Sequence, residues 1–131
     1  MALAKQNLGF PVVVSAGTTS SVYTVSASKS AYIRGIIICN TFSGSISTTI
    51  SQTVQIYAVP NGQSAGATNR IARITLTPDD TFFFDLQYPI TLTTNGDSIR
   101  VFNEGSNATT ISGLTASTNP VNVMVLGDIE L

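Results

Sequence analysis

The chain has 131 residues, which is enough for one domain with a single hydrophobic core. Only 10% of the residues are charged and the six Lys and Arg are scattered, so we expect no basic surface that binds nucleic acid. No apolar run approaches the ~18 residues of a membrane span, so no membrane partner is expected either. The opening "MALAKQNLGFPVVV" lacks the apolar core of a signal peptide, which indicates a protein made in the cytoplasm.

Short runs of β-branched and aromatic residues alternate with clusters of Gly, Pro, Asn and Ser, a pattern typical of strands joined by turns. The expected strands are residues 12–15, 21–26, 31–41, 46–50 with 53–59, 72–77, 81–86, 90–93, 98–103, 109–114 and 121–131. This spacing predicts one all-β domain over residues 11–131, an antiparallel β-sandwich or jelly roll, with a closed barrel as the lesser alternative. Residues 1–10 are interpreted as a short N-terminal arm.

Four of the expected strands are apolar on both faces, whereas a strand of a freestanding sandwich should have one polar face. These runs are residues 12–14, 36–39, 82–84 and 123–126. Three explanations stay open: both faces are buried at a sandwich corner or under a loop, a neighbouring subunit covers the second face, or that face lines a ligand groove. The scarcity of charged residues gives weight to the neighbouring subunit.

Alternation along the strands predicts which side chains form the core. Phe82 and Phe84 point to one side of their strand and Phe83 to the other, and we assign the pair to the core because two aromatics outnumber one. Cys39 has no disulfide partner in the chain, and its apolar surroundings predict a buried thiol. The predicted core is Tyr23, Val25, Ile33, Ile37, Cys39, Ile56, Ile74, Phe82, Phe84, Ile99, Val101, Val123 and Val125.

The sequence offers no convincing catalytic, cofactor or metal site. It contains no histidine, which removes the Ser-His and Cys-His nucleophile pairs and the commonest transition-metal ligand. Asp79 and Asp80 follow Pro78, where hydrogen bonding within a turn is the expected role and a weak calcium site is the alternative. We therefore expect a protein that is not an enzyme and that has no cofactor, metal or small-molecule substrate.

Four stretches combine turn and strand residues in a familiar order. They are "VYTVSASKSAYIRGIIICNT" at residues 22–41, "VQIYAVPNGQSAGATN" at residues 54–69, and "GDSI" at residues 96–99 followed by "VNVMVLGDIEL" at the C-terminus. This order resembles small β-sandwich structural proteins of tailed bacteriophages. The resemblance covers most of the chain beyond the arm and departs at residues 109–120, which look like an insertion.

The resemblance implies a virion protein, made in the host bacterial cytoplasm, whose partner is the major capsid protein or another virion protein. Its leading implication is a capsid decoration (cement) protein that oligomerises on or between capsid subunits and stabilises the particle. A protein at the head-tail junction, the tail or a fibre base is also consistent with it. A carbohydrate-binding module, or a tail- or fibre-attached accessory protein used in host adsorption, is the alternative, although the chain has no Trp to form a sugar platform.

An assembly role requires contact surfaces, and the sequence suggests two of them. One is the second apolar face of the strands that contain residues 36–38 and Phe83. The other is the arm, which we expect to reach a neighbouring subunit, with folding back onto its own domain as the alternative. The candidate interface residues are Leu3, Lys5, Leu8, Phe10, Ile36, Ile38 and Phe83.

Overall fold

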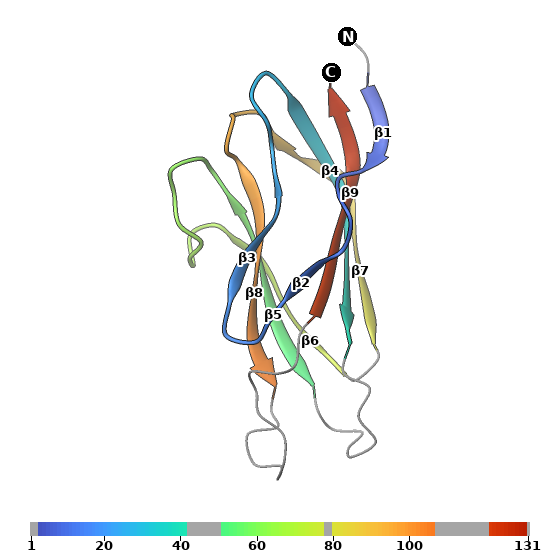
Figure 1. Cartoon of the computed structure of the whole chain (residues 1–131), viewed down its shortest axis with the longest axis vertical. Helices are drawn as coiled ribbons and strands as arrows, with labels where there is room; N and C mark the ends of the chain where they lie inside the picture. Colours follow the sequence, from blue (N-terminus) through green and yellow to red (C-terminus); the bar gives the residue numbers. More distant parts are fainter. Residues whose placement is uncertain (1–2, 42–50, 78–79, 107–120, 131) are drawn as a thin grey trace.

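The computed structural model describes residues 3–41, 51–77, 80–106 and 121–130 (Figure 1). Within these residues the chain forms nine β-strands and no helix, which confirms the predicted all-β class. In chain order the strands are β1 (Leu3–Asn7), β2 (Val12–Val14), β3 (Thr19–Thr24), β4 (Ser30–Asn40), β5 (Gln52–Val59), β6 (Arg70–Leu76), β7 (Thr81–Leu92), β8 (Ser98–Ser106) and β9 (Val121–Glu130).

The strands form two antiparallel sheets that pack face to face (Figure 1). Sheet A has the order β2–β9–β4–β7, and β1 pairs with the opposite end of β9. Sheet B has the order β3–β8–β5–β6. Most connections cross from one sheet to the other, and this strand order is that of a jelly roll. The prediction of a β-sandwich is therefore confirmed.

The strand boundaries differ from the prediction in two places. The segments expected at 81–86 and 90–93 form one strand, β7, because its intervening residues bulge out of the sheet without ending it. Asp85 lies opposite Gly35 and Ile90 lies opposite Ile33, so residues 86–89 face only Arg34. The expected strands at 46–50 and 109–114 lie outside the described residues.

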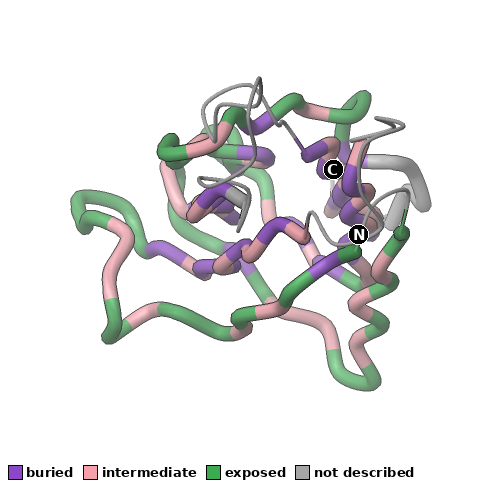
Figure 2. Tube along the Cα trace, turned by 90° about the horizontal axis from the view of Figure 1, so that it is seen from below, coloured by how far each residue is buried: buried purple, intermediate pink, exposed green. Residues whose placement is uncertain are grey.

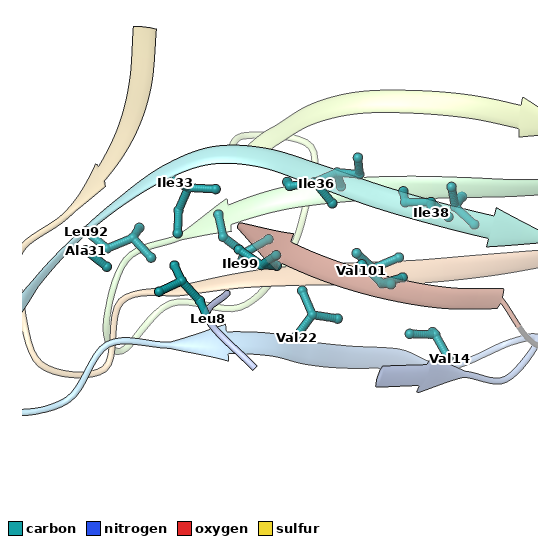
Figure 3. Close-up of a cluster of buried hydrophobic side chains, with 14 of the residues drawn as sticks. Leu8, Val14, Val22, Ala31, Ile33, Ile36, Ile38, Leu92, Ile99 and Val101 are labelled. Atoms are coloured by element: carbon teal, nitrogen blue, oxygen red, sulfur yellow. The ribbon is translucent and has the colours of Figure 1, made fainter. Parts of the chain in front are cut away.

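The core consists of buried side chains from both sheets, and Figure 2 marks the buried residues along the trace. Figure 3 shows side chains from both sheets meeting there, among them Ile33, Ile36 and Ile38 of β4 and Ile99 and Val101 of β8. Seven residues of the predicted core are confirmed as buried: Val25, Ile33, Ile56, Ile99, Val101, Val123 and Val125.

Four other predicted core residues, Tyr23, Ile74, Phe82 and Phe84, are only partly buried. They lie on β3, β6 and β7, which are edge strands of the two sheets, so neighbours cover them from one side only. The predicted direction of the aromatic run is nevertheless correct. Phe82 and Phe84 pack against the core, with their ring centroids 6.1 Å apart, while Phe83 is 67% exposed.

The prediction for β4 is wrong after Ile33. A β-bulge at Arg34 shifts the register between Ile33 and Gly35 against both neighbouring strands. An extra residue reverses which side chains face inward. Ile36 and Ile38 are therefore fully buried in the core, while Ile37 and Cys39, expected to be buried, lie half-buried on the opposite face.

Gly127 of β9 makes this bulge possible. A Cβ atom at this position would lie 2.1 Å from the carbonyl oxygen of Tyr32 and 3.2 Å from the Cα of Ile33. Because those neighbours are backbone atoms, they cannot move aside as a side chain would. The glycine thus permits the close approach of β9 to β4 at the point where β4 changes face.

Three fully buried amide side chains connect the sheets at one end of the core. Asn40 of sheet A donates to the carbonyl oxygens of Leu76 and Thr77, and its own Oδ1 accepts from Gln52 Nε2 at 2.6 Å. Asn103 donates to Gln52 Oε1 and to the carbonyl oxygen of Val14 on β2. These bonds satisfy polar groups that would otherwise be costly to bury, and they tie sheet A to sheet B.

The N-terminal segment belongs to the sheet of its own chain. β1 pairs antiparallel with the end of β9, from Leu3 opposite Glu130 to Asn7 opposite Leu126. Leu8, directly after β1, is buried in the core and its amide donates to the carbonyl oxygen of Val125. The prediction of an arm that becomes ordered only against a neighbour is therefore wrong. An extended segment beside an unpaired strand edge gains backbone hydrogen bonds by pairing within its own subunit.

Candidate interaction surface

The face of sheet A that points away from sheet B carries an apolar patch, formed by cross-strand neighbours on β2, β9, β4 and β7. Ile37 at its centre lies opposite Phe83 on one side and Met124 on the other. Phe83 is 67% exposed and Val13 is 59% exposed, which is unusual for side chains of this size. We call this set the apolar patch; its members are Val13, Ile37, Cys39, Phe83, Met124 and Leu126.

A groove of about 300 Å³ opens beside Phe83, where the bulge of β4 meets β7 and β9. Gly35 leaves the groove open because glycine has no side chain. The residues opposite Gly35 on the neighbouring strands are Asp85 on β7 and Leu126 on β9. Its lining consists of Gly35, Ile36, Ile37, Phe83, Phe84, Asp85 and Leu126. Asp85 is the one charged residue of this lining, and it is exposed.

Beyond the bulge, the same face of sheet A becomes polar. Arg34 forms an ion pair with Asp128, whose side chain is 4% exposed. The Tyr32 hydroxyl donates a 2.9 Å hydrogen bond to Glu130, and this bond is the main reason that the pKa of Tyr32 is raised. These charged groups have partners within the chain, so the apolar patch has a polar boundary on that side.

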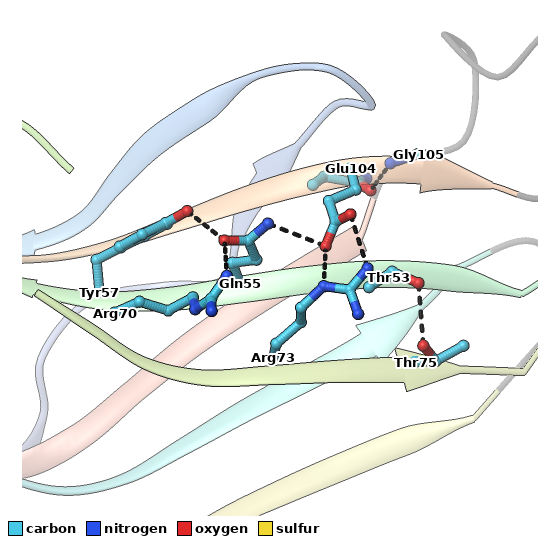
Figure 4. A network of polar contacts seen from close by, with 9 residues as sticks. Thr53, Gln55, Tyr57, Arg70, Arg73, Thr75, Glu104 and Gly105 are labelled. Atoms are coloured by element: carbon cyan, nitrogen blue, oxygen red, sulfur yellow. Dashed lines mark hydrogen bonds and ion pairs between the residues drawn. The ribbon is translucent and has the colours of Figure 1, made fainter. Parts of the chain in front are cut away.

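The outer face of sheet B is polar across several strands (Figure 4). Arg73 holds the Glu104 carboxylate through two hydrogen bonds, of 2.7 and 3.0 Å, and Gln55 donates a third. The bond from Arg73 is the first cause of the lowered pKa of Glu104. Tyr57 and Arg70 both donate to Gln55 Oε1. The polar side chains of this face are thus occupied with one another, in contrast to the apolar patch of sheet A.

The predicted interface residues divide into three groups. Phe83 and Phe10 are exposed, at 67% and 86%, as an outward role requires. Leu8, Ile36 and Ile38 are buried in the core of their own chain, so the prediction that they face a neighbour is wrong. The cause is the pairing of β1 for Leu8 and the bulge of β4 for the two isoleucines. The remaining two, Leu3 and Lys5, lie in β1, and their side chains are outside the described part of the structure.

Sequence reasoning missed most of the apolar patch. Val13, Met124 and Leu126 lie in runs already noted as apolar on both faces, but alternation alone does not say which face is outer. Ile37 and Cys39 were assigned to the core because strict alternation was carried from Ile33 through the whole strand. The glycine at position 35 was the available signal, since an isolated glycine within a strand pattern suggests a bulge.

Of the acidic residues in the 77–85 region, the structure describes Asp80 and Asp85. Asp79 lies outside the described residues. Asp80 accepts a hydrogen bond from the Thr81 amide and donates its own amide to the Thr77 carbonyl, which confirms the turn interpretation for this residue. Among the described residues no group of three or more His, Cys, Asp or Glu side chains is placed to hold a metal ion. No helix long and apolar enough to cross a membrane occurs in that part of the chain.

The half-buried Asp97 carboxylate accepts three hydrogen bonds from backbone amides, and its role is to hold loops together. Its Oδ1 accepts from the Asn61 amide at 2.9 Å, and its Oδ2 accepts from the amides of Thr93 and Thr94. These bonds, with that of Asn61 first, lower the pKa of Asp97. The carboxylate therefore links the turn after β5 to the turn before β8.

No protein-family model matches the chain, and a search of curated proteins finds no match to it. Its candidate function is therefore argued from its own residues.

Proposed function

We propose that the chain is a non-enzymatic structural protein of a bacteriophage virion, with decoration of the capsid as its leading role. The observation that carries this proposal is the apolar patch on sheet A. Phe83 is largely exposed there beside Ile37, which lies opposite Met124 on its other side. Val13, opposite Asn122 at the edge of the sheet, is largely exposed as well, while the outer face of sheet B is polar across several strands. An exposed apolar face on a chain with few charges is typical of a surface covered by another protein.

The size of this face suits a protein partner. Sheet A is four strands wide along β2–β9–β4–β7, and β9 has 10 residues. With about 4.8 Å between strands and about 3.3 Å per residue, the flat footprint is roughly 600 Å². One side of a stable protein interface covers about 800 Å² of accessible surface, and rough side chains give more accessible area than footprint. The whole outer face of sheet A, with the polar part beyond the bulge as a rim, is thus close to the area that one partner needs.

The fold and the sequence resemblance support the same role. Jelly rolls occur in viral capsid proteins and also in lectins, so the topology alone does not decide between assembly and sugar binding. The stretches at residues 22–41 and 54–69, with the C-terminal strand, resemble small sandwich proteins of tailed phages. Assembly is favoured because the apolar patch is aliphatic around one phenylalanine, whereas sugar platforms are built from exposed Trp and Tyr.

The test is the protein content of purified particles of the virus that encodes the chain. We expect mass spectrometry to detect it in a fixed ratio to the major capsid protein. Phe83→Asp should reduce that ratio, because a charge in the patch would be desolvated by the partner. Ile71→Ser is the matched control, since Ile71 is 40% exposed on β6, away from the patch. Absence from particles, or equal loss with both variants, would contradict the proposal.

A carbohydrate-binding role remains the second candidate because of Tyr88. This residue lies in the part of β7 that bulges opposite Arg34, and it is 79% exposed. A solvent-exposed tyrosine is suited to stacking against a sugar ring. Glycan-array binding that is lost in Tyr88→Ala, with Phe83→Asp unaffected, would favour this candidate over assembly.

A further inference from the structure

We propose that two copies of the chain pair across a two-fold axis through their apolar patches, with the Phe83 side chain of each copy entering the groove of the other beside Gly35. This inference rests on the proposed assembly role and names the occupant of the patch. It follows from two features that lie side by side on one face. Phe83 projects from β7 with 67% of its surface exposed, and the groove of about 300 Å³ opens next to it.

A two-fold interface uses the same surface on both subunits, so it needs a projection and a matching recess close together. The apolar patch has both. When one copy is turned about an axis between Phe83 and the groove, each phenylalanine faces the other's groove and the two rings come together at the axis. Aromatic pairs in such contacts contribute to stability beyond the burial of their surface.

The groove has the size and lining that a phenyl ring requires. A cavity of about 150 Å³ is enough to hold benzene, so a groove of about 300 Å³ admits one phenylalanine side chain. Ile37 and Leu126 give the groove apolar walls, and Gly35 contributes only backbone atoms. Asp85 is exposed at its rim, where the carboxylate can stay hydrated and lie beside the positive edge of the entering ring.

No like charges meet within the apolar patch itself when two identical faces pair, and Asp85 at the rim of the groove stays exposed. None of the six members of the apolar patch is an Asp, Glu, Lys or Arg. Beyond the bulge, Arg34 is paired with Asp128, and Glu130 accepts a hydrogen bond from Tyr32. Two whole outer faces of sheet A, each of roughly 600 Å² with the polar part beyond the bulge included, reach the lower end of the area that stable interfaces bury. We therefore expect a dimer of micromolar affinity rather than a permanent one.

Sedimentation velocity of the full chain over about 1–300 µM is the test. The wild type should change from the 13.7 kDa monomer to a species of twice that mass. Phe83→Asp should weaken association at least about tenfold, as expected when a central aromatic of an interface is removed. Ile71→Ser should leave it unchanged, since Ile71 lies on β6 of sheet B.

Gly35→Leu distinguishes insertion of Phe83 into the groove from non-specific hydrophobic association. A Cβ at Gly35 would have only one neighbour within 4 Å, the Phe84 carbonyl oxygen at 3.7 Å, so a side chain is tolerated there. The substitution makes the face more apolar but fills the groove, and we expect it to weaken the dimer. Stronger association in Gly35→Leu would overturn the proposal, because hydrophobic adhesion without insertion of Phe83 would then explain the contact.

A smaller substitution at Gly35, a folding control and the labelling of Cys39 complete the test. Gly35→Ala, with a smaller side chain, should weaken association less than Gly35→Leu, and the thermal unfolding of each variant shows that it is folded. Cys39 belongs to the apolar patch and is half-buried, so its labelling rate should fall as wild-type concentration rises and stay constant in Phe83→Asp. A wild type that remains monomeric throughout would refute the pairing even if the protein is found in particles.

Discussion

Replacing Ile36 and Ile37 by alanine, one at a time, tests the bulge that decides which face of β4 is outside. Ile36 is fully buried, with Phe84 and Val125 as its cross-strand neighbours. The change to Ala removes three carbon atoms, which at about 0.8 kcal/mol each amounts to about 2.4 kcal/mol of lost burial. The cavity left behind adds about 1 kcal/mol, so the total is about 3–4 kcal/mol. Ile37 faces outward, and its loss should cost about 1 kcal/mol or less.

Urea unfolding followed by far-UV circular dichroism measures the difference, since the chain has no tryptophan for fluorescence. For a chain of this size, each kcal/mol corresponds to about 4 °C in Tm, so Ile36→Ala should melt about 12–16 °C below the wild type. The protein should be dilute enough to be monomeric, because association through the apolar patch would add to the effect of Ile37→Ala. Equal losses, or a larger loss for Ile37→Ala, would refute the register shift at Arg34.

Three further predictions concern other parts of the fold. Gly127→Ala should destabilise the protein by about 3 kcal/mol or more in the same urea assay, because the new Cβ would collide with the Tyr32 carbonyl. A loss of stability under about 1 kcal/mol would contradict the close approach of β9 to β4. Asp97→Asn should lower the urea midpoint at pH 7, where the carboxylate of lowered pKa is ionised in both states and stabilises the fold. The difference in urea midpoint between Asp97→Asn and the wild type should shrink as the pH falls from about 4 through the pKa of Asp97 in the folded protein. A difference in midpoint that does not depend on pH would exclude the Asp97 carboxylate as its source. Deletion of residues 2–7 should lower Tm, because β1 pairs with β9 of its own chain, and an unchanged Tm would restore the arm interpretation.

The fold class follows from the sequence because period-two runs and turn residues recur along the whole chain. The direction of the aromatic run also follows, since alternation over three residues leaves Phe83 alone on its side. The face of β4 after Ile33 does not follow, because one inserted residue reverses it and the run of isoleucines fits both arrangements equally well. Gly35 and Gly127 show in the sequence that the strands are irregular there, but not that the two irregularities coincide.

The candidate surface was only partly predictable for a related reason. Four apolar runs without a polar side suggest that some apolar face is exposed. The groove beside Phe83 could not be predicted, because it exists only where Gly35, Asp85 and Leu126 from three strands lie in one row. The pairing of β1 was equally hidden, since a segment of five residues reads as an arm until its partner strand is known.

The most direct test of the assembly role is the protection of Cys39 in the purified particle. Cys39 lies on the outer face of sheet A, and a cysteine introduced by Thr75→Cys in a Cys39→Ser background reports on sheet B, where Thr75 is exposed. Labelling with a thiol reagent is compared for free dilute protein and for particles. We predict that particles protect Cys39 strongly and the thiol at position 75 much less. Equal labelling of Cys39 in the free and particle-bound protein would contradict the claim that the apolar patch is the assembly surface.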